Sequence, residues 1–252
     1  MNNILIVNDD GIRAKALTLL QKKLAPMGSI TTVAPETPKN ATGNSLTLHK
    51  PVRVRQVDKH RYTTSGTPAD CTRIGILTIL KDNVDLVISG INDGANLGDD
   101  IYYSGTVAGA REAALLGIPA IASSLVTGNN KTKNFDTAAA ITFNLAQKVL
   151  QHSLPHRKFL NLNVPNEPAD KIQGVKTTRL GVRIYDRKVR ERKDPAGKTY
   201  YWILGDILSG HRDKGTDLRA ISEKFAAITP LTMDSTDYKL SEIIKKWKIN
   251  LN

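Results

Sequence analysis

The chain has 252 residues, 40% of them hydrophobic, so it can bury a sizeable core and does not have the composition of a disordered protein. A single cysteine, Cys71, excludes an internal disulfide framework. Together with an N-terminus that does not resemble a signal peptide, it favours a location in the cytoplasm. No apolar run approaches the roughly 18 residues of a membrane span. Lysine and arginine outnumber the acids by 36 to 24, and the net charge of +12 favours polyanionic partners or, equally, a basic solvated surface.

The N-terminal segment begins with an apolar run at residues 4–7, which predicts a buried strand of a parallel sheet. This strand leads directly into Asp9 and Asp10. Leucines at helical spacing over residues 17–24 predict a helix, and residues 30–33 predict a second strand. Together these segments form a β-α-β unit, whose connection we expect to be right-handed.

Strands and helices continue beyond a polar loop that contains Asn40. The predicted elements are one or two strands over residues 46–57, a helix from Pro68 capped by Thr67, a strand over 85–90, a helix over 107–117, a strand over 118–124, a helix from Asp136 or Thr137 to about Leu150, and a strand over 159–164. We therefore expect an α/β fold in which residues 1–172 form a doubly wound, mostly parallel sheet.

The last third of the chain consists of short alternating stretches. A basic segment, Arg183 to Lys193, and the following residues up to Leu204 flank the sequence DPAG, which predicts an exposed hairpin arm. A late core strand is predicted over residues 225–231, and an apolar stripe over residues 240–247 predicts an amphipathic terminal helix. We interpret residues 173–252 as an arm and oligomerisation region that is appended to the catalytic core. We expect the basic residues of the arm to lie near the mouth of a site, where they can attract an anionic substrate.

Polar loops follow three of the predicted strands. Asp9 and Asp10 lie at the carboxyl end of one strand, and the loops after residues 34 and 89 lie at the same edge, where open α/β sheets bind ligands. Adjacent carboxylates repel unless a cation neutralises them, and oxygen ligands favour Mg²⁺, Mn²⁺ or Ca²⁺ over zinc. The alternative is that the two acids cap the following helix, for which one acid would suffice.

Ser104, Gly105 and Thr106 lie where a loop meets a predicted helix N-terminus, which is a natural phosphate site. An ordinary Ser or Thr N-cap is equally compatible with these residues. The chain contains neither a Walker A motif nor GxGxxG, which disfavours P-loop ATP cleavage and dinucleotide binding.

Six motifs occur in order along the chain: NDDG, APETPKNATGNSLTL, TTSGTPADC, SGINDGANLG, YSGTVAGA and GTD at residues 215–217. Together they resemble the SurE (survival protein E) family of metal-dependent nucleoside monophosphate phosphatases over almost the whole chain. The resemblance implies a Rossmann-like three-layer core and homodimers or homotetramers that exchange the C-terminal arm. It also implies 5′-nucleotidase activity, with 3′-nucleotidase or exopolyphosphatase side activity.

The same resemblance implies one divalent metal ion per subunit, Mg²⁺ or Mn²⁺, with the ligands Asp9, Asp10, Asn40 and Asn92. The family commonly has serine at the position of Asn40, and an amide oxygen can also coordinate a hard cation. The residues that the resemblance implies for phosphate binding are Asn96, Ser104, Gly105 and Thr106.

In the mechanism that the resemblance implies, Asp9 and Asp10 are the catalytic carboxylates, and the ion polarises the phosphate and activates the water that attacks phosphorus. Phosphate transfer to one of these aspartates is an open alternative. A receiver-type regulatory domain is the rival class, but such domains need an acceptor aspartate at the end of a later strand, and the matching positions in this chain are Pro35 and Ser89 or Gly90. The substrate is expected to be a nucleoside monophosphate, with no membrane and no specific nucleic acid as partner.

Overall fold

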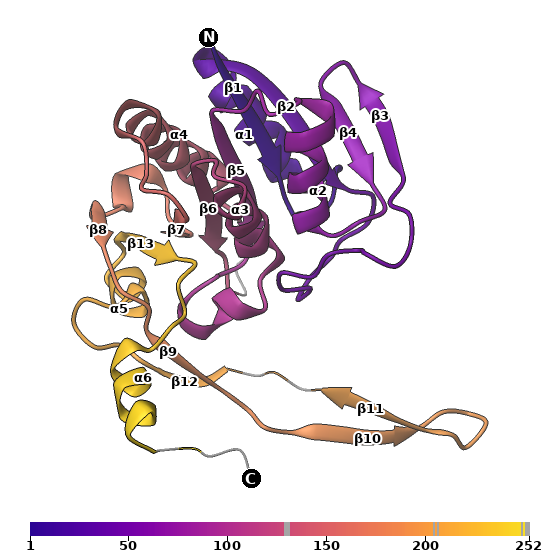
Figure 1. The fold of residues 1–252 in the computed structure, drawn as a ribbon, viewed down its shortest axis with the longest axis vertical. Helices are drawn as coiled ribbons and strands as arrows, with labels where there is room; N and C mark the ends of the chain where they lie inside the picture. The colour runs from indigo at the N-terminus through magenta and orange to yellow at the C-terminus, as the bar shows by residue number, and fades with distance from the viewer. Residues whose placement is uncertain (129–131, 204, 206, 248, 250–252) are drawn as a thin grey trace.

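A nine-stranded sheet forms the centre of the molecule (Figure 1). This computed structural model describes residues 1–128, 132–203, 205, 207–247 and 249. In spatial order the strands are β3 (Val54–Asp58), β4 (Arg61–Thr64), β2 (Gly28–Pro35), β1 (Asn2–Val7), β5 (Leu86–Asp93), β6 (Ala120–Val126), β7 (Lys158–Pro165), β13 (Ala226–Thr232) and β8 (Val175–Thr177). The run from β4 to β7 is parallel, whereas β3 and β13 pair antiparallel with β4 and β7. The predicted mostly parallel sheet is confirmed.

Helices cover both faces of this sheet. The helices that the structure describes are α1 (Lys15–Leu24), α2 (Pro68–Ile74), α3 (Gly105–Leu115), α4 (Phe135–His152), α5 (Asp217–Ser222) and α6 (Tyr238–Ile244), with short helical turns η1 (Ala25–Met27), η2 (Gly75–Ile79), η3 (Gly98–Tyr102), η4 (Ala169–Lys171) and η5 (Lys245–Trp247). Helices α1 and α4 lie on one face, and α2 and α3 lie on the other (Figure 1). None of the described helices is long and apolar enough to cross a membrane.

The central strand β1 is apolar without interruption because both of its faces are covered. Ile4 and Ile6 pack in the cluster that contains α1 and α4, whereas Leu5 and Val7 pack in the cluster that contains α2 and α3. All four side chains are fully buried. The three-layer, doubly wound architecture predicted from this run is therefore confirmed.

The order of the strands creates a switch point beside β1. The chain passes from β1 through α1 to β2 on one side, and after β4 it returns through α2 to β5 on the other side of β1. In open α/β sheets such a reversal leaves a crevice outside the carboxyl ends of the two strands concerned, here β1 and β5. The candidate site lies there.

An extended arm leaves the body after β8 (Figure 1). Its root is the antiparallel pair β9 (Val182–Tyr185) and β12 (Ile207–His211), and its outer part is the hairpin of β10 (Val189–Lys193) and β11 (Thr199–Ile203). The predicted hairpin is confirmed, although Leu204, its predicted end, lies outside the described residues. The predicted terminal helix is present as α6 and η5.

One predicted strand region is largely wrong. Of residues 46–57, only the part from Val54 onward forms a strand, β3. Thr47 instead forms two hydrogen bonds with the first turn of a later helix. Its backbone N–H and its hydroxyl both donate to the Asp70 carboxylate, at 3.0 and 2.6 Å. Asp70 belongs to the capping box that starts α2 with Thr67, and the predicted Thr67 N-cap is confirmed. Leu46–Arg53 has the alternating pattern of a strand, but the hydrogen bonds from Thr47 to Asp70, which is distant in sequence, hold this segment outside the sheet.

Candidate functional site

A pocket of about 300 Å³ opens at the carboxyl ends of β1 and β5. Segments far apart in the sequence meet there, namely the loops after β1, β2 and β5, the start of α3 and the root of the arm. The lining residues predicted from sequence are Asp9, Asp10, Asn40, Asn92, Asn96 and Ser104. Gly105 and Thr106, which were predicted with them, lie directly behind this lining at the start of α3.

The first of the paired aspartates, Asp9, is buried, and Asp10 beside it is half-buried. Asp9 is 5% exposed, and its Oδ1 accepts a hydrogen bond of 2.6 Å from the Thr106 hydroxyl. Burial raises the pKa of Asp9, and burial together with repulsion from Asp9 raises the pKa of Asp10 to about 6. Burial is the largest cause of both shifts. A bound cation would offset both.

The aspartates do not cap the following helix, which was the alternative interpretation. Helix α1 begins at Lys15 after Ala14, and no side chain accepts a hydrogen bond at its N-terminus. Asp10 instead faces β5, where its Oδ2 accepts from the backbone N–H of Asp93 at 3.3 Å. The pair therefore belongs to the pocket and not to the helix.

Two asparagines offer further oxygen ligands at this pocket. The Nδ2 of Asn92 donates to the Gly94 carbonyl at 3.0 Å, so its amide oxygen is left for another partner. Asn40 is exposed, and its loop is tied to the site because the backbone N–H of Lys39 donates to the Asp9 carbonyl at 2.8 Å. Within the described ranges no cluster of three or more His, Cys, Asp or Glu side chains is placed to hold a metal. Two carboxylates with amide oxygens form a donor set that fits Mg²⁺ or Mn²⁺.

The N-terminus of α3 lies directly against Asp9. Ser104 is the N-cap, and its hydroxyl oxygen accepts from the Val107 N–H at 3.0 Å. Glycine at position 105 allows the helix to lie this close, because a Cβ there would be 2.8 Å from the Asp9 Cβ. Thr106 is fully buried and directs its hydroxyl at Asp9, not into the pocket. In this structure Thr106 orients the aspartate, and the phosphate contact expected of it stays a prediction.

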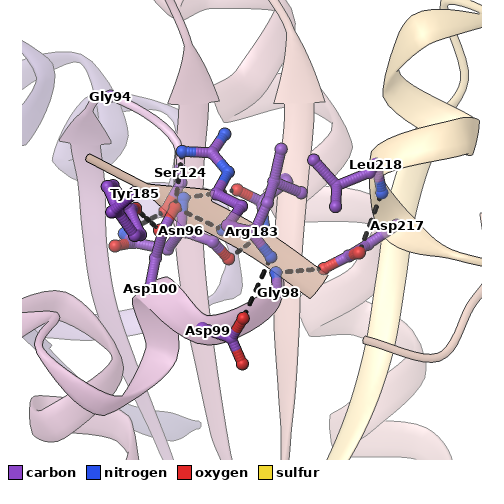
Figure 2. A network of polar contacts seen from close by, with 12 residues as sticks. Gly94, Asn96, Gly98, Asp99, Asp100, Ser124, Arg183, Tyr185, Asp217 and Leu218 are labelled. Atoms are coloured by element: carbon purple, nitrogen blue, oxygen red, sulfur yellow. Dashed lines mark hydrogen bonds and ion pairs between the residues drawn. The ribbon is translucent and has the colours of Figure 1, made fainter. Parts of the chain in front are cut away.

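Asn96 is held by the core of the sheet. Its backbone N–H donates to Asn163 Oδ1 at 2.9 Å, and its carbonyl accepts from the amide groups of Asn161 and Asn163 at 2.8 and 2.9 Å. Its own Nδ2 donates to Ser124 Oγ at 2.8 Å (Figure 2). Because β6 and β7 supply these partners, the segment 94–97 after β5 is fixed although it forms neither helix nor strand.

Residues of the arm root also line the pocket. The sequence predicted basic residues of the arm near the mouth of a site, but it did not single out Arg183 or Tyr185. Figure 2 shows Arg183 and Tyr185 beside Asp100. The guanidinium Nη1 of Arg183 lies 2.8 Å from Asp100 Oδ2, and the Tyr185 hydroxyl donates to Oδ1 of the same carboxylate. In the sequence VRIY, positions 183 and 185 lie on one face of a strand because side chains alternate along it. This alternation is the only sequence pattern that could have predicted that Arg183 and Tyr185 act together.

Another residue that the sequence did not assign, Asp217, joins the arm root to the site. Its carboxylate is fully buried and accepts three backbone hydrogen bonds of 2.8 Å, from Gly98 to Oδ2 and from Gly181 and Leu218 to Oδ1 (Figure 2). A Cβ at Gly98 would lie 2.8 Å from the Gly181 carbonyl oxygen, and its φ is +52°. Asp217 belongs to the GTD motif, whose role the sequence alone did not reveal.

Known proteins resemble this chain in sequence and in fold. The sequence model of the family described as survival protein SurE matches residues 4–187. The 5′-nucleotidase SurE of Geobacter sulfurreducens is 43% identical over 248 residues, covering 98% of this chain and 94% of that protein. That of Pelobacter propionicus is 44% identical over 245 residues, covering 97% and 99%. The crystal structure of the SurE protein from Aquifex aeolicus matches with a TM-score of 0.86 at 40% identity, covering 98% of this chain and 100% of that one.

Proposed function

The chain belongs to the SurE family, and from this premise we propose that it is a phosphoric monoester hydrolase that converts nucleoside monophosphates to nucleoside and phosphate. The observation that carries the proposal is the meeting of two adjacent carboxylates, one buried and one half-buried, with a helix N-terminus in one pocket. The carboxylates can hold a cation, and the helix start favours an anion. A phosphate monoester bound to a cation satisfies both.

The reaction depends on a divalent metal ion, Mg²⁺ or Mn²⁺, one in each subunit. The residues that would hold it are Asp9, Asp10, Asn40 and Asn92, whose oxygens fit such an ion. When bound, the ion supplies Lewis-acid polarisation of the phosphate and lowers the pKa of an attacking water.

The chain's own residues prepare the site for this chemistry. Thr106 fixes the orientation of Asp9 through its 2.6 Å hydrogen bond. The first turn of α3, with Ser104 at its start, offers a positive helix end to the phosphate oxygens. Asn96, anchored to β6 and β7, is the side chain that would fix the other side of the phosphate.

The finer properties of the proposal concern substrate range, assembly and location. The names of the curated relatives favour the 5′-phosphate as the principal substrate. Activity on 3′-phosphates and on short polyphosphate is proposed as a side reaction, because the pocket is open and its phosphate-binding groups need no base. The active form would be a cytoplasmic homodimer or homotetramer that exchanges the arm.

The deciding experiment measures phosphate release from a panel of nucleoside 5′- and 3′-monophosphates with Mg²⁺, with Mn²⁺ and with chelator. We expect release that requires the metal and is fastest with 5′-monophosphates. Equal rates in chelator would contradict the metal dependence. Salt-sensitive binding to oligonucleotides without any phosphate release would instead favour a nucleic-acid-binding role.

A further inference from the structure

The side chains that line the pocket carry more negative than positive charges. Among the described lining residues there are four carboxylates, those of Asp9, Asp10, Asp93 and Asp100, and a single cation, Arg183. A divalent metal ion would offset Asp9 and Asp10, and Asp93 already forms an ion pair with Lys133. A phosphate dianion that enters this pocket therefore still needs a positive partner from the protein.

We propose that Arg183, at the root of the arm, binds the phosphate group of the substrate. The inference rests on the proposed function and adds a residue that the metal and phosphate motifs do not contain. Arg183 suits the task because a guanidinium carries five N–H donors in a rigid fork that matches phosphate oxygens. Its Nη1 is occupied by Asp100, and its buried Nε has no hydrogen-bond partner among the residues that the structure describes.

The guanidinium is held in place before substrate arrives. Its side chain is 11% exposed, and the Asp100 side chain that it contacts is 10% exposed. Tyr185, two positions further along β9, donates its hydroxyl to the other oxygen of Asp100, so the carboxylate is shared between two residues of the arm root. The backbone N–H of Arg183 donates to Asp99 Oδ2 at 2.9 Å. A preorganised cation loses little entropy on binding an anion.

Asp100 would act as a positioning residue and a counter-charge. Without substrate it neutralises Arg183, which would otherwise be a buried cation with no partner. With substrate, the remaining donors of the guanidinium turn to the phosphate while Nη1 stays on Asp100. Because Asp100 and the phosphate group share the donors of one guanidinium, this arrangement would also limit the affinity for the product, inorganic phosphate.

The alternative is that Arg183 only attaches the arm to the body through Asp100. The two roles differ in what a substitution changes. A structural ion pair would alter the unfolding midpoint and the subunit association, whereas a phosphate contact alters the KM for substrate and the inhibition by phosphate. Three variants of the full-length protein separate them: Arg183→Gln, Arg183→Lys and the control Arg187→Gln. Arg187 is exposed, lies outside the pocket lining and carries the same charge.

The measurements are KM and kcat with a nucleoside 5′-monophosphate, the inhibition constant of inorganic phosphate, the Mn²⁺ affinity and the urea midpoint. For Arg183→Gln we expect KM and the inhibition constant to rise roughly 10- to 100-fold, as for a lost charge-assisted hydrogen bond, with unchanged Mn²⁺ affinity. Arg183→Lys should lie between the wild type and Arg183→Gln, and Arg187→Gln should match the wild type. An unchanged KM and unchanged phosphate inhibition in Arg183→Gln would overturn the proposal, as would an equal rise in Arg187→Gln.

Two further outcomes are informative. If Arg183→Gln does not fold, Arg183→Lys decides, because it keeps the charge and removes the fork; wild-type phosphate inhibition in that variant would contradict the inference. If the wild type releases no phosphate from any nucleotide, the proposed function fails. Calorimetric titration of the Mn²⁺-loaded protein with inorganic phosphate then still tests Arg183, and equal affinities of wild type and Arg183→Gln would refute its role.

Discussion

At the scale of single residues, the site is built around Asp9. Thr106 donates its hydroxyl to one carboxylate oxygen, and Gly105 allows the helix to approach because it lacks a Cβ. The carbonyl of Asp9 holds the loop that carries Asn40, by accepting from Lys39. One residue thus connects three segments of the site.

Replacing Asp9 with asparagine tests the charge of the pair. Asparagine has nearly the same shape, and its Oδ1 can still accept from Thr106, so the unfolding midpoint should stay near that of the wild type. We expect kcat/KM to fall by at least about 100-fold, because the cation loses a negative ligand. A variant with wild-type turnover would exclude Asp9 from the catalytic pair.

Asn40 can be tested by exchanging its ligand atom. Asn40→Ser keeps an oxygen and should retain substantial activity, whereas Asn40→Leu has a similar size but no oxygen and should abolish activity at ordinary metal concentrations. Stability should not change in either variant, because Asn40 is exposed. Metal-titrated phosphate release is the measurement, and unchanged turnover in the leucine variant would remove Asn40 from the ligand set.

Gly105→Ala tests the close approach of α3. The added Cβ would lie 2.8 Å from the Asp9 Cβ and 3.0 Å from its Oδ2, so either the helix or the aspartate must move. We expect a loss of stability of about 1–3 kcal/mol in urea unfolding, together with reduced kcat. Gly205→Ala is the matched control, because no atom lies within 4 Å of a Cβ at that position. Equal behaviour of the two variants would argue against the predicted clash.

At the scale of elements, the root of the arm and the turn η3 act as one unit. Asp217 accepts from Gly98 in η3, from Gly181 just before β9 and from Leu218 in its own helix. These bonds place Arg183 and Tyr185 opposite Asp100. The position of the arm root therefore depends on a side chain from α5, which itself packs near β13 and β7.

The substitution Asp217→Asn should weaken the attachment of the arm root to η3. Asparagine has only one acceptor oxygen. Its NH₂ group would replace the other carboxylate oxygen and would face a backbone N–H, so at least one buried N–H would lose its acceptor. We expect a loss of stability of about 2–4 kcal/mol and a raised KM, with unchanged Mn²⁺ affinity. The control Asp213→Asn removes an exposed carboxylate and should change neither quantity. A wild-type KM for Asp217→Asn would show that the arm root is positioned by other contacts.

How far the sequence predicted these elements depends on where their partners lie. β1 and the Thr67 cap could be predicted because their signals are local, an apolar run and a capping box. The strand over Leu46–Arg53 could not be excluded, because Thr47 binds Asp70 of a later helix. Likewise, Asp9 and Asp10 could be assigned to a site from their position after a strand, whereas Arg183 looked like one cation among many until the fold placed it beside Asp100.

At the scale of the whole molecule, the arm and the tail carry several large apolar side chains that are exposed to solvent. Tyr201 and Trp202 are 61% and 60% exposed, Ile203 is 86% exposed, and Trp247 is 60% exposed. Large exposed apolar groups gathered on a projecting element are typical of interfaces. An arm exchanged between two protomers would bury them and close a two-fold dimer.

We therefore expect a homodimer or a higher even oligomer in solution. Light scattering on dilute full-length protein should give at least twice the monomer mass of 27.6 kDa. Replacing residues 189–203 with a short Gly-Ser linker should weaken the association while leaving β9 in place. A monomer mass that persists at micromolar concentration would contradict the exchange, and so would a linker variant that remains fully associated and fully active.

The hydrogen bond between Gly98 and Asp217 joins residues 119 positions apart, and this separation matters while the chain is being made. Asp9 and Asp10 leave the ribosome early, whereas Asp217 follows roughly 10 to 40 seconds later at ordinary rates of translation. Until then η3 lacks its anchor, and the arm root cannot be fastened beside it. A prematurely terminated chain would carry the acidic pair without the wall that faces it, so the pocket is completed only at the end of synthesis.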